Sequence, residues 1–483
     1  MKPRHLPAQE PDGLFKTPLE RFIDVGQPLV QLADRIDWSG LEAKVEAQFS
    51  KEGRPGVPSR FMLGMLILKS VENLSDEDLF ARWPRDPYYQ YFTGELYFQH
   101  QVPHERSGLS HWRSRLGADL LDHLLQESLR VAHGSGALRG SDMEAVTVDT
   151  TVQQKAIRFP TDASLLYTAL VQLGILARQS GLKLRQSYIR VGKRALIMVG
   201  RYGHAKQYKR RNREIRFLKT RLGRVIRDIE RLIEENKVLE AHFSEPLAKA
   251  RIILGQALNR KASPKIYSWH AAEVECIGKG KARAPYEFGC KATITSTNGC
   301  APGGMFVLHA DALHGNPYDG HTLGNVLTET ADLTGVTPKR AFVDKGYRGH
   351  QQNRFHFDPE TRQDTRPPWR VFTAGRKALK PHLKAELKRR PAIEPIIGHL
   401  KTDHRMDRNH LKGKNGDRFN VKMAAIGFNF RRVLAWLRDI LRQFFDQGSA
   451  KSVAAILNNK LFGNWGPLLS PVAKRKVPRM AVC

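Results

Sequence analysis

The sequence has few cysteines and no long apolar run, and both features narrow the class of protein. Its 483 residues include four cysteines, and no two of them form a C-x-x-C pair. This spacing argues against a zinc finger and against a disulfide scaffold, and it fits a reducing cytosol. No stretch reaches the roughly 18 uninterrupted apolar residues of a membrane helix, and the N-terminus lacks an apolar signal segment. We therefore expect a soluble, cytoplasmic protein with no membrane partner.

Acidic residues are scarce relative to basic ones. Asp and Glu number 48 against 79 Lys and Arg, which gives a formal net charge of +31. Such an excess repels itself in a compact chain and usually reflects a polyanionic partner, of which nucleic acid is the first candidate. A solvated basic surface is the alternative. Although the chain has 18 histidines, it contains no H-E-x-x-H motif that would indicate a zinc hydrolase.

Changes in residue pattern divide the chain into regions. Residues 1–27 are polar and are expected to form a flexible arm. Region 28–135 has a helical pattern, and region 140–446 mixes strand and helix signals, with a helical insertion at about 164–260. Residues 447–483 are expected to form a basic C-terminal tail. This order predicts an all-α N-terminal domain followed by an α/β domain.

The N-terminal helical region ends in a short basic helix at residues 107–117. Short helices joined by turns are typical of helix-turn-helix DNA-binding domains, so we expect Arg113 and Arg115 to contact DNA. A plain helical bundle is the alternative. For the long helical segment 213–240, the pattern favours core packing on one face and solvated charges on the other.

Three acidic residues lie where an α/β fold can bring side chains together. Asp149 ends the strand pattern VTVD, Asp344 ends AFVD, and Glu394 lies on a predicted helix. If the two strands are neighbours in one sheet, these carboxylates can hold two divalent metal ions at a separation suited to displacement at phosphorus. Oxygen ligands without cysteine favour Mg²⁺, for which Mn²⁺ can substitute.

The residues around Glu394 strengthen this prediction. Arg390 lies four residues before it and Lys401 seven after it, so on a helix all three share one face. Pro395 must either begin this helix or kink it. A single Asp at a strand end is more often a turn or cap residue than a metal ligand, and we assign that ordinary role to four other aspartates: Asp142, Asp162, Asp311 and Asp319.

These motifs resemble those of the DDE transposases of bacterial insertion sequences, specifically the group called insertion-sequence family five. Arg390, Glu394 and Lys401 match its R-x3-E-x6-K signature, although Leu387 stands where the signature has Tyr. Four further segments resemble the N-terminal domain and the regions of the first and second Asp of that family. These segments are 74–100, 148–166, 315–323 and 343–349.

The resemblance implies a ribonuclease-H-like catalytic core with a helical insertion, preceded by the DNA-binding domain. It implies that Asp149, Asp344 and Glu394 are the catalytic residues and ligands of two metal ions. Residues expected at the DNA are Arg390, Lys401, His399, Arg348, Arg113 and Arg115. The chain would bind terminal inverted repeats as a homodimer or larger assembly on the bacterial nucleoid, cleave phosphodiesters and join 3′-hydroxyls to target DNA. A decayed DNA-binding protein and a nuclease without strand transfer are the alternatives.

Overall fold

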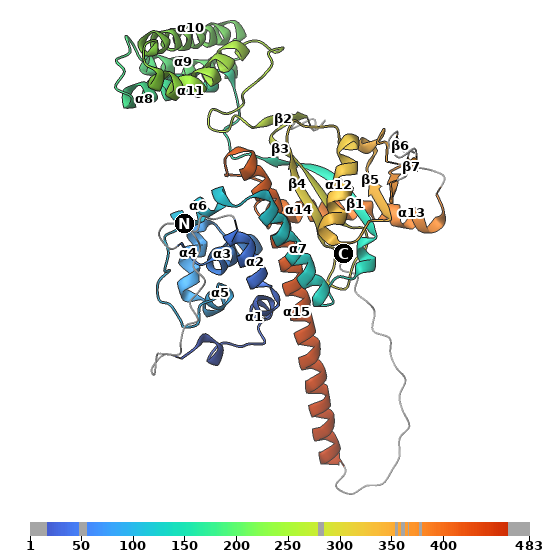
Figure 1. Cartoon of the computed structure of the whole chain (residues 1–483). Coiled ribbons are helices and arrows are strands. Elements are labelled where there is room, and N and C mark those ends of the chain that lie inside the picture. Colours follow the sequence, from blue (N-terminus) through green and yellow to red (C-terminus); the bar gives the residue numbers. More distant parts are fainter. Residues whose placement is uncertain are drawn as a thin grey trace.

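A computed structural model of the chain describes most of its residues. The described ranges are 17–47, 56–278, 285–352, 356–358, 363–365, 367–375 and 379–461. They form a mixed α/β structure with more helix than strand, in which a sheet lies beside an N-terminal helical region and a separate helical bundle projects from the sheet (Figure 1). Among the described residues, no helix is long and apolar enough to cross a membrane.

The N-terminal region consists of short helices packed around α3, which is buried along nearly its whole length. Local signals start several of them: the Ser75 hydroxyl accepts a hydrogen bond from the Asp78 backbone, and Asp37 caps α2 in the same way. The helices are α1 (Pro28–Arg35), α2 (Trp38–Glu46), α3 (Ser59–Val71), α4 (Asp76–Arg82), α5 (Pro87–Phe92), α6 (Ser107–Arg115) and α7 (Ala118–Gly134).

The segment before α1 differs from the flexible arm expected at residues 1–27. Leu19 is buried, and its backbone N–H donates to the carbonyl of Leu96 at 2.8 Å. Ile23 packs in the same small apolar cluster. Residues 17–27 are therefore held against the helical region, and residues 1–16 of the expected arm lie outside the described residues.

The sheet has the strand order β2-β3-β1-β5-β8, with β4 pairing to β3. β1 runs antiparallel to β3 and parallel to β5, which confirms that the strands carrying Asp149 and Asp344 are neighbours. The strands are β1 (Ala145–Gln154), β2 (Glu275–Gly278), β3 (Tyr286–Thr297), β4 (Val307–Leu313), β5 (Arg340–Val343) and β8 (Arg370–Thr373). A separate pair is formed by β6 (His356–Asp358) and β7 (Gln363–Thr365).

The chain leaves the sheet after β1 and forms four helices before it returns at β2 (Figure 1). These helices have a hydrophobic core of their own, separate from the core that the sheet shares with the N-terminal helices. The Lys155 ammonium, where the chain departs, lies 2.9 Å from the Glu273 carboxylate, where it returns. The helices are α8 (Asp162–Gln179), α9 (Ile189–His204), α10 (Tyr208–Ile233) and α11 (Lys237–Gln256).

The C-terminal part of the chain covers the sheet and ties it to the N-terminal helices. The buried Asn429 on α15 accepts from the Val307 backbone at 2.9 Å and donates to the Ser128 hydroxyl at 3.0 Å. α15 continues to Leu461, so residues 447–461 of the expected tail are helical, and residues 462–483 lie outside the described residues. The remaining helices are α12 (Asp319–Thr334), α13 (Pro381–Lys388), α14 (Ile393–Thr402) and α15 (Gly413–Leu461).

Candidate active site

Asp149 and Asp344 are brought together by the parallel pairing of β1 and β5. The register pairs Thr147 with Phe342, so Asp149 and Asp344 follow the paired segment at the same end of both strands. Val146 and Val148 on β1 are fully buried, which fixes the orientation of the strand. Asp344 stands directly after β5, where its carboxylate accepts from the Gly346 backbone at 2.7 Å.

Glu394 reaches the same place from the first turn of α14. Ile393, Ile396 and Leu400 form the buried face that packs this helix against β1 and α15. Pro395 is the third residue of the helix, where its missing N–H leaves no hydrogen bond unmade, so it begins the helix and does not kink it. The Glu394 side chain is 66% exposed, which leaves its carboxylate open to solvent.

Arg390 lies between the three carboxylates. One of its terminal nitrogens is 2.7 Å from the Asp149 carboxylate and 4.0 Å from that of Asp344. The other is 3.7 Å from the Glu394 carboxylate. The three acids that the sequence singled out therefore converge on one positive charge.

Burial controls the ionisation of Asp149. It raises the pKa of this carboxyl to about 6, because the charged form loses hydration, while the positive charge of Arg390 opposes the rise. An unfolded Asp has a pKa of about 4. The folded chain therefore holds the proton more tightly, and the stability that this proton supplies is lost as the pH rises through 6. At neutral pH the carboxylate is ionised and attracts a cation.

The arrangement fits a divalent metal ion by its donor chemistry. Its converging donors are carboxylate oxygens, the ligands that hard cations such as Mg²⁺ prefer. The Arg390 guanidinium already occupies the point that the oxygens share, as a cation of lower charge. Asp149, Asp344 and Glu394 would hold the metal.

A fourth acid, Asp319, belongs to the same neighbourhood, although its sequence pattern predicted only a turn or cap. It is the first residue of α12, and its carboxylate accepts from the Thr150 hydroxyl and from the Lys291 ammonium, both at 3.1 Å. A Cβ added at Gly346 would lie 3.6 Å from its carboxylate and 3.0 Å from that of Asp344. The only sequence signal was its position in the 315–323 segment.

The residues expected to contact DNA have different surroundings. His399 is paired with Asp403 at 3.0 Å on the exposed side of α14, and Lys401 is half-buried. Arg348 and Arg115 are exposed. Arg113 departs from the expectation: its side chain is 10% exposed, and both of its terminal nitrogens bind the Asp76 carboxylate, at 2.9 and 2.7 Å. This ion pair joins α4 to α6 and gives Arg113 a structural function.

Of the other three aspartates, Asp142 has the cap role that its sequence position predicted, whereas Asp162 makes a long-range hydrogen bond and Asp311 lies within β4. Asp142 accepts from the Arg139 backbone at 3.0 Å, and Asp162 accepts from the Leu258 backbone at 2.8 Å. Asp311 accepts from the Ala312 backbone at 2.7 Å. Each satisfies a backbone donor away from Arg390.

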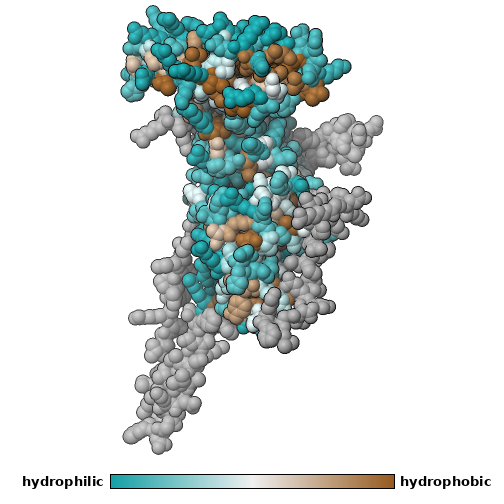
Figure 2. All heavy atoms as spheres, turned by 90° about the vertical axis from the view of Figure 1, so that its left-hand side faces the viewer, coloured by the Kyte–Doolittle hydropathy of each residue, from teal (hydrophilic) through white to brown (hydrophobic). Residues whose placement is uncertain are grey.

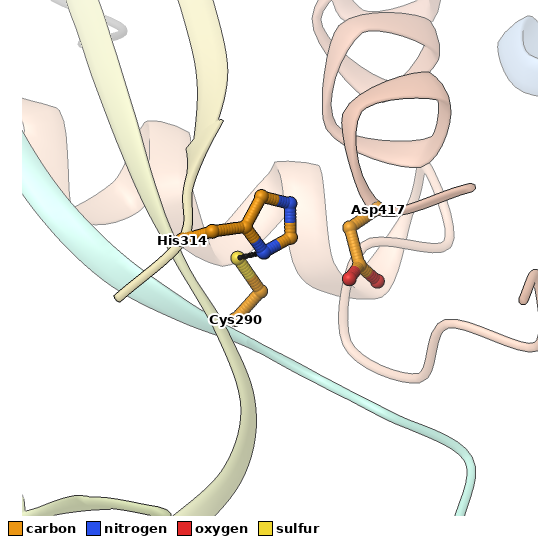
Figure 3. A group of neighbouring side chains, drawn as sticks. All are labelled: Cys290, His314 and Asp417. Atoms are coloured by element: carbon orange, nitrogen blue, oxygen red, sulfur yellow. Dashed lines mark hydrogen bonds between the residues drawn. The ribbon is translucent and has the colours of Figure 1, made fainter. Parts of the chain in front are cut away.

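A second cluster of potential metal ligands lies between β3 and α15. Figure 3 shows the His314 ring between the Cys290 thiol and the Asp417 carboxylate, and these side chains offer atoms within 4.8 Å of one another. Burial raises the pKa of the Cys290 thiol, so the group stays protonated at neutral pH. Lys155 lies 2.7 Å from Asp417 and compensates its charge. The cluster therefore joins the sheet to α15 as a buried polar contact.

Comparisons with known proteins match two parts of the chain to transposase families. Residues 17–115 match the family described as "Transposase domain (DUF772)", and residues 369–434, which contain Arg390 and Glu394, match the family described as "Transposase DDE domain".

One relative shares extensive identity with the chain. A Rhizobium meliloti protein with the printed name "Uncharacterized protein ORF8 in nfe locus" is 41% identical over 202 residues, which cover 42% of this chain and 98% of the relative. No solved structure matches the chain. The matched transposase domains carry the functional assignment: the chain belongs to the DDE transposases, metal-dependent enzymes that cleave and transfer DNA strands.

Proposed function

We propose that this chain moves an insertion sequence of the family-five type by cleaving its ends and joining the 3′-hydroxyls to target DNA. The convergence of Asp149, Asp344 and Glu394 on Arg390 is the observation that carries the proposal. Two Mg²⁺ ions, or Mn²⁺ in their place, would supply activation of the attacking oxygen and stabilisation of the leaving one when bound.

The chain's own residues would orient the DNA backbone around these acids. Arg390 offers planar donors suited to a phosphate, and it is held beside Asp149 before DNA arrives. Lys401, His399 and Arg348 lie on elements that adjoin the site and would contact the phosphates on either side. A β1-β5-β8 parallel unit beside antiparallel strands supports a ribonuclease-H-like core.

Asp319 would act as a positioning residue in this site. It accepts from Thr150, the neighbour of Asp149, and it lies beside the Gly346 turn that orients Asp344. The Lys291 ammonium neutralises its charge, so it would hold the two strand ends in register without binding metal itself.

The N-terminal helical region would recognise the terminal inverted repeats. Arg115 is exposed on α6, the basic helix of that region, and remains a candidate for a DNA contact. Because two element ends must be joined in one reaction, the active form would be a homodimer or larger assembly on the bacterial nucleoid.

The test uses the full-length chain, duplex DNA carrying the element ends that flank its gene, and Mg²⁺. We expect wild type to cut and join these ends and Asp344→Asn to lose activity by about a thousandfold, as when a group that stabilises developing charge is removed. Asp332→Asn, which removes an exposed acid on α12, is the matched control and should retain activity.

Three outcomes separate the alternatives. Binding without cutting by wild type would identify a DNA-binding protein that has lost catalysis. Cutting without joined products would identify a nuclease. Equal activity of wild type and Asp344→Asn would remove the carboxylate site from the proposal.

A further inference from the structure

The helical bundle carries a large share of the positive charge of the chain. α9 contains four Lys or Arg and no acid, and α10 contains ten Lys or Arg and three acids. These two helices therefore contribute +11 to a formal net charge of +31. For residues 213–240, which include most of α10, the sequence alone predicts an ordinary solvated face.

Six of the exposed cations of α10 lie in one line along the helix. We call them the α10 stripe: Lys209, Arg213, Arg216, Arg224, Arg227 and Arg231. Steps of three or four residues, with Thr220 in the one gap, keep all six on one face. The opposite face is buried in the bundle core, so packing fixes the stripe toward solvent. The apolar side chains of that face are Ile215, Leu218, Leu222, Val225, Ile226, Ile229 and Ile233.

Acidic partners are largely missing along the α10 stripe. Arg231 is paired with Asp228 at 2.9 Å. Among the residues that the structure describes, no carboxylate forms an ion pair with Lys209, Arg213, Arg216, Arg224 or Arg227. The acid Glu230, on the same helix, is held by Arg251 of α11. On a surface that serves only solubility, basic and acidic residues are usually mixed.

The position of α10 leaves room for a large partner. Figure 1 shows α10 at the end of the bundle that lies farthest from the sheet. In Figure 2 the corresponding upper rim of the molecule is hydrophilic along its length. The α10 stripe is therefore a surface separate from Arg390 and the three carboxylates.

The dimensions of the α10 stripe fit duplex DNA. Its ends are 22 residues apart, which is about 33 Å at the helical rise of 1.5 Å per residue. Duplex DNA advances about 3.4 Å per base pair, so the stripe spans roughly ten base pairs. Side chains of this type bind phosphates without reading the base sequence.

We infer that the α10 stripe is a second, sequence-independent DNA-binding surface that holds the duplex away from the carboxylate site. The inference rests on the proposed function, the cleavage and joining of DNA, and adds a second surface that binds the same DNA. Phosphate contacts release counterions, and each one contributes about 0.9 to the slope of log K against log salt on B-DNA. Loss of the stripe therefore has a measurable signature that loss of catalysis lacks.

The experiment compares full-length variants for binding to a long duplex of unrelated sequence across a salt series. The stripe variant combines Lys209→Gln, Arg213→Gln, Arg216→Gln and Arg227→Gln. We expect its salt slope to fall by about 3 to 4. The matched control removes four exposed cations elsewhere on the bundle, through Arg178→Gln, Lys183→Gln, Lys237→Gln and Arg260→Gln, and should change the slope by less than about 1.

A conservative variant and a cleavage assay complete the design. Arg213→Lys, Arg216→Lys and Arg227→Lys keep the charge and should keep the wild-type slope. At low salt, bound stripe variant should still cleave element ends, since the catalytic acids are untouched. Equal slopes for the stripe variant and the matched control would overturn the inference, and so would altered self-association with unchanged DNA binding. Cleavage by wild type in those cases would leave the proposed function standing.

Discussion

The carboxylate site and the α10 stripe use arginine in opposite ways. Arg390 is 15% exposed and lies within 4.0 Å of three acids, whereas Arg213 and Arg216 are exposed on a surface nearly free of acids. At the site, burial makes each unpaired charge costly, so opposite charges must converge. On the bundle, water supports each charge separately, so like charges can accumulate until a polyanion binds.

This contrast distinguishes positive charge that maintains a structure from positive charge that attracts a partner. Arg113 belongs to the first kind, because it is bound to Asp76, although its place in a basic helix suggested the second. Burial and partners, which a sequence does not display, decide between the two. One comparison tests this contrast between the carboxylate site and the α10 stripe, and two more extend it to the core shared by the sheet and the N-terminal helices on one side and the helical bundle on the other.

The largest expected effect is on stability when Arg390 is removed. Arg390→Gln leaves Asp149 buried without its counter-charge, which should lower the free energy of unfolding by about 3 kcal/mol at pH 7 in chelator. Added Mg²⁺ should restore part of the loss. Arg213→Gln, the control on the α10 stripe, should change stability by less than about 0.5 kcal/mol. Urea unfolding measures both, and equal losses for the two variants would contradict the contrast.

Acid should weaken the shared core through His404. Burial lowers the pKa of this imidazole to about 4, although its hydrogen bond to the Ser70 carbonyl opposes the shift. The unfolded group has a pKa of about 6.5, so the unfolded chain binds the extra proton between these values. The stabilising contribution is full above pH 6.5, falls as the pH drops toward 4, and amounts to about 3 kcal/mol.

The measurement for His404 compares urea unfolding of wild type and His404→Asn from pH 7 to pH 4. The difference between the two proteins isolates this histidine from other titrating groups. His204→Asn removes an exposed histidine of the bundle and should leave the pH profile unchanged. A wild-type profile parallel to that of His404→Asn would show that His404 does not sense pH.

The smallest expected effects come from two glycines in helices. A Cβ at Gly427 of α15 would lie 2.6 Å from the Ser70 carbonyl oxygen of α3, so Gly427→Ala should destabilise the chain by about 2 kcal/mol. Gly200 of α9 has nothing within 4 Å, so Gly200→Ala should stabilise by up to about 1 kcal/mol. Thermal unfolding gives the signs, and a stabilised Gly427→Ala would show that the two helices are not closely packed.

Local patterns predicted much of the fold and the candidate site. The alternation before Asp149 and the short apolar run before Asp344 located both strands, and Pro395 predicted that α14 either begins or bends close to Glu394. These predictions succeeded because they depend on residues close together in the sequence. The R-x3-E-x6-K spacing of Arg390, Glu394 and Lys401 then indicated a catalytic function that none of these residues indicates alone.

Long-range contacts account for what the sequence did not predict. Asp319 resembled a helix cap, because nothing local indicates that Thr150 lies beside it. The pairing of Arg113 with Asp76 spans 37 positions and has no sequence pattern. Leu19 is held by the backbone of Leu96, which is distant in the sequence. Because this contact has no local signal, the sequence predicted residues 17–27 as part of a flexible arm. The role of the α10 stripe also needed the structure, since only packing shows which face is buried.

The ion pair between Lys155 and Glu273 has an evolutionary consequence. It joins the two ends of the helical insertion, just after β1 and just before β2, across 2.9 Å. Because its ends are adjacent, such an insertion can be exchanged, lengthened or lost while the order of the strands in the sheet stays the same. Its separate hydrophobic core makes its folding independent of the sheet. Gene rearrangement could therefore give the same catalytic sheet a new reach along DNA while leaving its chemistry unchanged.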